Sequence, residues 1–126
     1  MFEIKVEAEF EAAHRIVNYP GKCDRLHGHN WKVEMKITGK ILDGLGMLID
    51  FKEAKAALKE ATDELDHRFL NELEPFCTMN PTAENIAQYI YDKLKNHDLF
   101  QTAPVHLAAV CVWESPRACV TYSEDD

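Results

Sequence analysis

Apolar and polar residues alternate with a period of two along the first part of the chain. In residues 2–15, every second residue from Phe2 to Ala12 is apolar, and His14 is the next residue in this series. The residues between them are mostly charged. Because successive side chains of a β-strand point to opposite faces of the sheet, this pattern predicts a half-buried strand, or two collinear strand pieces, with His14 on the apolar face.

A second alternating segment covers residues 26–37. One of its faces carries His27, His29, Trp31, Val33, Met35 and Ile37. Between the two segments, Tyr19-Pro20-Gly21 is a turn signal, so the pair is expected to form a hairpin. The strand rise would place the Cβ atoms of His27 and His29 about 6.6 Å apart on one face. The hairpin would bring all three histidines to one surface at its loop end.

The middle of the chain predicts a loop followed by a helix. Residues 38–49 contain three glycines and are expected to form a loop that includes a short strand at 46–49. Asp50 and Glu53 have the spacing of a capping box, with Asp50 as the N-cap. The helix that they open is predicted to continue to about His67.

The last part of the chain predicts a second helix and two strands. A loop through Pro75 is followed by a helix start with Thr82 or Asn80 as its cap and with a stripe of apolar residues: Ala83, Ile86 or Ala87, Ile90 and Leu94. Residues 105–114 and 118–122 have the composition of strands. The order ββααββ favours the α+β class, an antiparallel sheet with two helices on one face.

Composition and charge narrow the class of protein further. The 126 residues are 46% hydrophobic and 29% charged, which is typical of one soluble globular domain spanning 1–126. Because no membrane span or signal peptide is recognisable, the expected location is the cytoplasm. The net charge of −8 argues against a nucleic-acid surface, which needs a basic stripe.

The histidines His14, His27 and His29 are predicted to bind zinc. Neutral imidazole is a common zinc ligand, and three histidines leave a fourth position for water or substrate. Cys23 precedes His27 by four residues, and Lys22, Arg25 and a nearby dication would favour its thiolate. Cys23 is therefore a candidate acid–base group. The alternative is that Cys23 is the fourth ligand of a closed structural site.

Three other positions have both a functional and a simpler interpretation. Asp66-His67 is either an imidazole oriented by a carboxylate for proton transfer or an ordinary helix end. Glu114 is either a solvated strand end or a buried anchor for an amidine-like pair of N–H groups. Thr82 is most economically a helix cap. The basic residues near the predicted site mouth are candidate phosphate contacts: Arg15, Lys22, Arg25 and Arg117.

A set of short motifs, in order along the chain, resembles the 6-pyruvoyl-tetrahydropterin synthase family. The motifs are Phe10-Glu11-Ala12-Ala13-His14-Arg15, Cys23-x-x-x-His27-Gly28-His29, Ile49-Asp50-Phe51, Leu65-Asp66-His67, Asn80-Pro81-Thr82-x-Glu84 and Val112-Trp113-Glu114. Each motif alone is modest evidence, but the set is specific. The spacing of Cys23 before His27 is most similar to the bacterial 6-carboxytetrahydropterin synthase branch of queuosine and 7-deazapurine biosynthesis.

The resemblance implies a tunnelling fold (T-fold) with a four-stranded antiparallel sheet and two helices. It also implies a homohexamer built from two trimers, with active sites between subunits. Matched position by position, the zinc ligands would be His14, His27 and His29, and the catalytic triad would be Cys23, Asp66 and His67. Glu114 would anchor the pterin, with Thr82 near the ring.

The activity implied by the resemblance is zinc-dependent conversion of 7,8-dihydroneopterin triphosphate to 6-carboxy-5,6,7,8-tetrahydropterin, acetaldehyde and triphosphate. One alternative keeps the fold but eliminates triphosphate without cleaving the side chain, which would yield 6-pyruvoyl-tetrahydropterin. An alternative from another class is a non-catalytic zinc module with a closed Cys-His₃ site.

Overall fold

The computed structural model describes residues 1–21 and 25–124. Its elements, in chain order, are β1 (Phe2–His14), β2 (His27–Gly39), α1 (Phe51–Asp63), β3 (Arg68–Phe69), the 3₁₀ turn η2 (Leu70–Glu72), α2 (Ala83–Lys95), α3 (Asp98–Thr102), β4 (His106–Ser115) and β5 (Ala118–Tyr122). None of the helices in these two ranges is long and apolar enough to cross a membrane.

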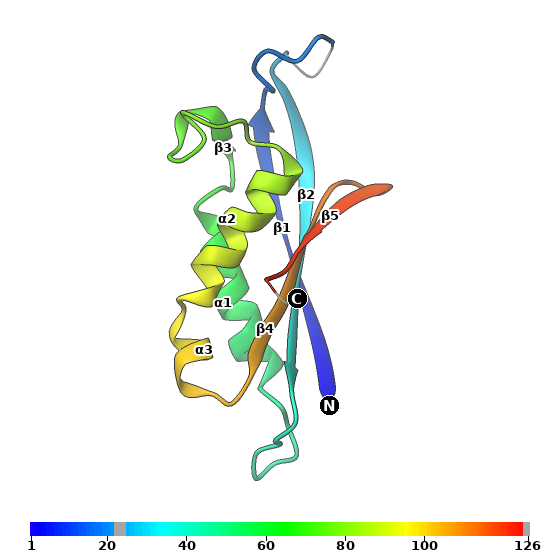
Figure 1. Ribbon diagram of the computed structural model, residues 1–126, viewed down its shortest axis with the longest axis vertical. Helices are drawn as coiled ribbons and strands as arrows, with labels where there is room; N and C mark the ends of the chain where they lie inside the picture. The colour runs from blue at the N-terminus through cyan, green and yellow to red at the C-terminus, as the bar shows by residue number, and fades with distance from the viewer. Residues whose placement is uncertain (22–24, 125–126) are drawn as a thin grey trace.

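A twisted sheet forms one layer, and α1 and α2 cover one of its faces (Figure 1). The strand order is β3-β1-β2-β4-β5. The predicted hairpin is confirmed, because β1 and β2 pair antiparallel in unbroken register from Phe2 opposite Gly39 to His14 opposite His27. The two strands therefore present their alternating apolar residues to the same side.

The core lies between this sheet and the two long helices. Trp31 and Met35 of β2 are fully buried, as are Leu58 of α1 and Ile90 of α2. Both helices begin where the sequence predicts. Asp50 caps α1 by accepting a hydrogen bond from Lys52 N, and Thr82 rather than Asn80 caps α2.

The predicted α+β class is confirmed, but the sheet has five strands and is mixed, not purely antiparallel. The additional strand β3 is two residues long and pairs parallel to β1, with Arg68 opposite Ala12 and Phe69 opposite Ala13. A strand of two residues has no alternation from which it could be predicted. The antiparallel pairs β1–β2, β2–β4 and β4–β5 match the predicted four-stranded arrangement.

The first helix ends at Asp63, so its predicted end at about His67 was wrong. Residues 64–67 form a turn in which His67 has a positive φ of 57°. Its backbone N–H donates to Glu11 O of β1 at 2.6 Å. The chain therefore leaves the helix early because bonds to β1 replace the last helical turn.

The predicted short strand at 46–49 was also wrong, because these residues form bends and irregular backbone that follow a turn at Gly44 and Leu45. The side chain of Asp43 organises that turn by accepting hydrogen bonds from the backbone N–H groups of Leu45 and Met47, at 2.8 and 3.0 Å. Gly46 has a φ of 81°, a conformation that glycine adopts without steric cost.

The helix α3 was not predicted. It is only five residues long, and its N-cap is His97, whose Nδ1 accepts from Leu99 N at 3.1 Å. Sequence rules for helix starts favour Ser, Thr, Asp or Asn at this position, so the signal was absent.

Candidate functional site

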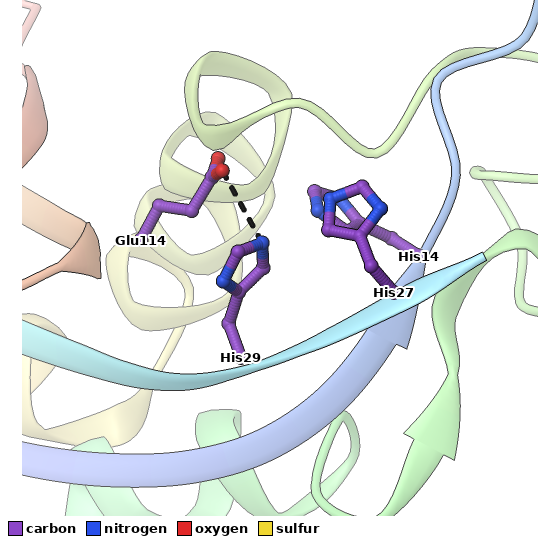
Figure 2. Close-up of side chains that lie close together, drawn as sticks. All are labelled: His14, His27, His29 and Glu114. Carbon is purple, nitrogen blue, oxygen red and sulfur yellow. Dashed lines mark ion pairs between the residues drawn. The ribbon is translucent and has the colours of Figure 1, made fainter. Parts of the chain in front are cut away.

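The three predicted histidines converge at the loop end of the β1–β2 hairpin (Figure 2). His14 is the last residue of β1 and lies opposite His27, the first residue of β2. The ring centroids are 4.5 Å apart for His14 and His27, 5.2 Å for His14 and His29, and 4.9 Å for His27 and His29. The strand register therefore produces the cluster that the alternation predicted.

Hydrogen bonds at Nδ1 fix the tautomers of His14 and His27. His14 Nδ1 lies 2.8 Å from Pro81 O, and His27 Nδ1 lies 2.7 Å from Arg25 O. Because a carbonyl oxygen only accepts, each Nδ1 must carry the proton. This leaves the lone pair of each Nε2 available to a metal, as in zinc sites where a carbonyl orients the ligating ring.

The cluster has unsatisfied polar atoms of the kind that a metal would satisfy. Nε2 of His14 and Nε2 of His29 are both buried and make no hydrogen bond. Buried polar atoms in native proteins almost always have a partner. One ligand atom from each of the three histidines and from Glu114 lies within 4.8 Å of the others. These residues therefore fit a metal ion such as zinc, for which imidazole nitrogen and carboxylate oxygen are ordinary ligands.

The surroundings of His14 and His29 favour the neutral form of both rings. Burial is the main cause that lowers the pKa of these two residues. The hydrogen bond to Pro81 O at His14, and the nearby carboxylate of Glu114 at both residues, oppose this effect only in part. The fully buried Trp31 forms an apolar floor, with its ring 5.0 Å from that of His14 and 5.3 Å from that of His29. Neutral imidazole is the form that binds metals.

Glu114 lies in this cluster, and sequence reasoning missed that relationship. Its Oε1 is 3.3 Å from His29 Nε2 (Figure 2), which is within ion-pair distance, but the two atoms do not form a hydrogen bond. The residue comes from the end of β4, which pairs with β2 in a register that the sequence alone did not specify. Glu114 also lines a groove of about 510 Å³ together with His29, Lys32 and Trp113. It is thus placed either to bind a metal or to meet a ligand in the groove.

Asp66 and His67 form the expected carboxylate–imidazole pair. Asp66 Oδ1 lies 2.9 Å from His67 Nδ1 and also accepts from Glu11 N at 3.0 Å. The hydrogen bond from Glu11 N is the main cause that lowers the pKa of Asp66. Glu11 Oε2 lies 3.3 Å from His67 Nε2, so both ring nitrogens face carboxylates.

This pair is separate from the candidate metal ligands but shares a groove with one of them. A groove of about 530 Å³ is lined by His67, Glu11, Asn30 and His29, among others. The imidazole of His67 is largely exposed, with 73% of its side-chain surface accessible. Within one chain, His67 therefore faces open space.

Of two further predicted site residues, the structure describes Thr82 but not Cys23. Thr82 caps α2, because its Oγ1 accepts from Asn85 N at 3.1 Å, and the neighbouring Pro81 carbonyl meets His14. The simpler interpretation of Thr82 is therefore confirmed, while its contact with a pterin stays a prediction. Cys23 lies outside the described residues, as does Lys22, so the role of Cys23 also stays a prediction.

Comparisons with known proteins identify relatives of this chain. The profile of the family 6-pyruvoyl tetrahydropterin synthase matches residues 3–125. The chain is 32% identical to the 6-carboxy-5,6,7,8-tetrahydropterin synthase of Haemophilus influenzae, over 98% of this chain and 100% of that protein. It is 37% identical to the protein of the same name from Synechocystis sp., over 93% of this chain and 96% of that protein.

A solved structure has the same fold. The 6-pyruvoyl tetrahydropterin synthase of Caenorhabditis elegans superposes with a TM-score of 0.84 at 28% identity, over 98% of this chain and 96% of that chain. Because the family profile spans nearly the whole sequence and the fold agrees along its length, this chain belongs to the 6-pyruvoyl tetrahydropterin synthase family.

Proposed function

We propose that this protein is a zinc-dependent 6-carboxy-5,6,7,8-tetrahydropterin synthase. It would convert 7,8-dihydroneopterin triphosphate and water to 6-carboxytetrahydropterin, acetaldehyde and triphosphate, in the cytoplasm, as a step of queuosine and 7-deazapurine biosynthesis. The observation that carries the proposal is the convergence of His14, His27 and His29, two of which have a buried Nε2 without a hydrogen-bond partner. Relatives from Haemophilus influenzae and Synechocystis sp. have the name of this activity.

His14, His27 and His29 would hold the zinc ion. When bound, zinc supplies a Lewis acid that acidifies the hydroxyl and C–H groups of the substrate side chain. The carbonyls of Pro81 and Arg25 support this role, since they leave Nε2 of His14 and His27 free for a metal.

The proton-transfer groups would be Cys23 and His67. The Cys23 thiolate would accept a proton from the substrate side chain, and His67 would move protons on the opposite face. The 2.9 Å contact between Asp66 and His67 Nδ1 supports an oriented imidazole. Such groups contribute about 10²–10⁴ in rate each.

Glu114 would bind the pterin ring by accepting hydrogen bonds from its paired N–H groups, with Thr82 close to the ring. The groove of about 510 Å³ beside Glu114 supports this role, because it gives a flat ring access to the carboxylate.

The active enzyme would be a homohexamer of two trimers with sites between subunits. Two features support this assembly. In the described chain, β3 pairs with β1 only at Ala12 and Ala13, so most of the outer edge of β1 has no strand partner. Unpaired edges are suited to pairing with a strand of another copy. The exposed His67 could then face a site completed by a neighbour. Light scattering would measure the mass of the assembly.

The deciding experiment is incubation of the purified protein with dihydroneopterin triphosphate, followed by identification of the pterin and assay of acetaldehyde. The proposal expects 6-carboxytetrahydropterin with one acetaldehyde for each turnover. Formation of 6-pyruvoyl-tetrahydropterin without acetaldehyde would instead favour the alternative activity, that of a 6-pyruvoyl-tetrahydropterin synthase, which is the name of the similar Caenorhabditis elegans protein.

The non-catalytic alternative is a closed Cys-His₃ zinc module. X-ray absorption at the zinc edge tests it, because a sulfur ligand is distinguishable from nitrogen and oxygen ligands. The proposal expects no sulfur in the coordination shell of the resting protein. A Zn–S distance of about 2.3 Å would contradict a role for Cys23 as a base.

A further inference from the structure

The backbone that follows His14 is held by two asparagine side chains. Asn71 Oδ1 accepts from Arg15 N at 2.9 Å, and Asn71 Nδ2 donates to Arg15 O at 3.0 Å. Asn80 repeats this arrangement two residues later, with 2.9 Å from Val17 N to Oδ1 and 3.2 Å from Nδ2 to Val17 O. Each carboxamide forms hydrogen bonds with the backbone N–H and C=O of one residue, as a neighbouring strand would. The backbone is therefore held in place for three residues beyond the end of β1.

Asn80 also begins a run of three residues that tie this segment to the histidine cluster. Asn80 O accepts from Asn85 Nδ2 at 2.8 Å. The next residue, Pro81, offers the carbonyl that accepts from His14 Nδ1 at 2.8 Å. The third residue, Thr82, accepts from Asn85 N at 3.1 Å and starts α2. The Pro81 carbonyl, which orients His14, is therefore held in place because the residues before and after Pro81 both form hydrogen bonds with Asn85.

We infer that Asn80, supported by Asn71, is a positioning residue of the metal centre. This inference rests on the proposed metal binding by the histidine cluster. The side chain of Asn80 fixes the backbone at Val17, three residues after His14, and its neighbour Pro81 fixes the ring of His14. Asn71 fixes Arg15, directly after His14. The Asn80-Pro81 dipeptide thus holds both the ring of His14 and the segment that follows it, which keeps Nε2 directed at the metal.

A positioning role and a merely structural role have different consequences. The four hydrogen bonds of the two carboxamides lie near the surface, so their loss would lower thermal stability in either case. A structural role predicts unchanged zinc affinity in the folded variant. A positioning role predicts weaker zinc affinity at a temperature where the variant is fully folded, because the groups that orient metal ligands typically change affinity by 10–100-fold.

The experiment measures zinc affinity by competition with a chromophoric chelator at pH 7, on samples whose folding is checked by circular dichroism. We expect Asn80→Ala to bind zinc about tenfold more weakly than the unsubstituted protein, with a smaller loss in Asn71→Ala. The matched control is Asn96→Ala. Asn96 Nδ2 also donates to a backbone carbonyl, that of Asp92 at 3.0 Å, but at the far end of α2. This control should keep full affinity.

Cobalt substitution gives a second readout, since the visible spectrum of bound Co²⁺ reports on ligand geometry. A changed spectrum in Asn80→Ala and an unchanged one in Asn96→Ala are expected. If Asn80→Ala does not fold, Asn80→Ser and Asn71→Ala are measured in the same way. Zinc affinity equal to that of the unsubstituted protein in the folded Asn80 variant, or in both substitutes, would overturn the inference.

A further variant separates this inference from the proposed function. If the unsubstituted protein binds zinc and His14→Ala does not, the metal site stands, and the result for Asn80 decides the inference alone. If the unsubstituted protein fails to bind zinc, the proposed metal function fails first and the positioning role is lost with it.

Discussion

His29 and Glu114 face each other across the β2–β4 pair, with Nε2 and Oε1 3.3 Å apart. They come from strands separated by the entire helical region. His29 lines both grooves described above, and Glu114 lines the one of about 510 Å³. Glu114 could therefore bind a metal together with the histidines or bind a ligand beside it. These two roles are separable, because only one of them requires the carboxylate for metal affinity.

We predict that Glu114→Gln retains zinc but loses about thirtyfold in kcat/KM. Glutamine has the shape of glutamate, but its NH₂ group faces an N–H donor of the pterin. A charged hydrogen bond contributes roughly 2 kcal/mol, and each 1.4 kcal/mol corresponds to a factor of ten. Steady-state kinetics and zinc analysis of the same sample make the measurement.

The control for Glu114→Gln is Glu9→Gln, which removes a carboxylate from the same groove. We expect nearly unchanged kinetics from it. Loss of zinc from Glu114→Gln, but not from Glu9→Gln, would instead identify Glu114 as a metal ligand.

We predict that Cys23→Ala lowers kcat by about 10²–10⁴ while zinc content and thermal stability stay close to those of the unsubstituted protein. A general base contributes to the transition state, whereas a metal ligand contributes to metal binding. Product formation, zinc analysis and thermal unfolding therefore have to be measured together. Cys77→Ala removes an exposed thiol outside the proposed site and should leave all three unchanged. Zinc loss in Cys23→Ala would favour the closed-site alternative.

The backbone of His67 leads to a prediction about stability. Its φ of 57° lies in the left-handed region, which costs a residue with a Cβ about 1–2 kcal/mol and glycine far less. We therefore expect His67→Gly to be more stable than His67→Ala by about 1 kcal/mol in chemical denaturation. Both variants lose the imidazole, so the difference isolates the backbone.

The adjacent Arg68 supplies the control for this comparison. It lies in β3 and has no positive φ, so glycine should be less stable than alanine there. If alanine is preferred at both positions, His67 is not strained in solution. Strained residues of this kind cluster at functional sites, which agrees with the proposed role of the Asp66–His67 pair.

Much of the fold and site could be predicted because their signals are local. The alternation in residues 2–15 and 26–37 specifies which face of each strand is buried, and a hairpin then brings His14, His27 and His29 together. Asp50 and Thr82 cap their helices through hydrogen bonds to residues two and three positions away. Such interactions leave a signature in neighbouring sequence.

What could not be predicted depends on contacts between distant residues. The pairing of β2 with β4 places Glu114 beside His29, and the two residues are far apart along the chain. The early end of α1 follows from bonds that Asp66 and His67 make to Glu11. The side chains of Asn71 and Asn80 act as strand partners, a role that no periodicity shows.

The helix-free face of the sheet carries a group that should make stability depend on pH. Glu34 is only 8% exposed and accepts a hydrogen bond from Trp113 Nε1 at 2.9 Å, with Lys5 and Lys32 at 3.6 and 3.5 Å. Burial alone would raise its pKa, but the hydrogen bond and the two cations together outweigh burial and hold the pKa below the ordinary value of 4.5.

A lowered carboxyl pKa means that the unfolded chain binds the proton more readily than the folded chain does. The stabilisation by Glu34 is therefore fully present above about pH 4.5 and is lost as the pH falls through the lower, folded value. We predict that Glu34→Gln lowers stability at pH 7 by about 1 kcal/mol, because its two cationic partners are themselves partly exposed. It should also make the midpoint of thermal unfolding fall less steeply between pH 5 and pH 3.

The control for this prediction is Glu3→Gln, which removes an exposed carboxylate of β1 opposite Thr38 and should leave the acid profile unchanged. Thermal unfolding of the zinc-free protein is the appropriate measurement, because acid also releases metal from histidine ligands. If Glu34→Gln keeps the acid dependence of the unsubstituted protein, the cations do not stabilise the ionised carboxylate. A neutral amide would then accept the buried hydrogen bond from Trp113 equally well, and the charge of Glu34 would have no role in stability.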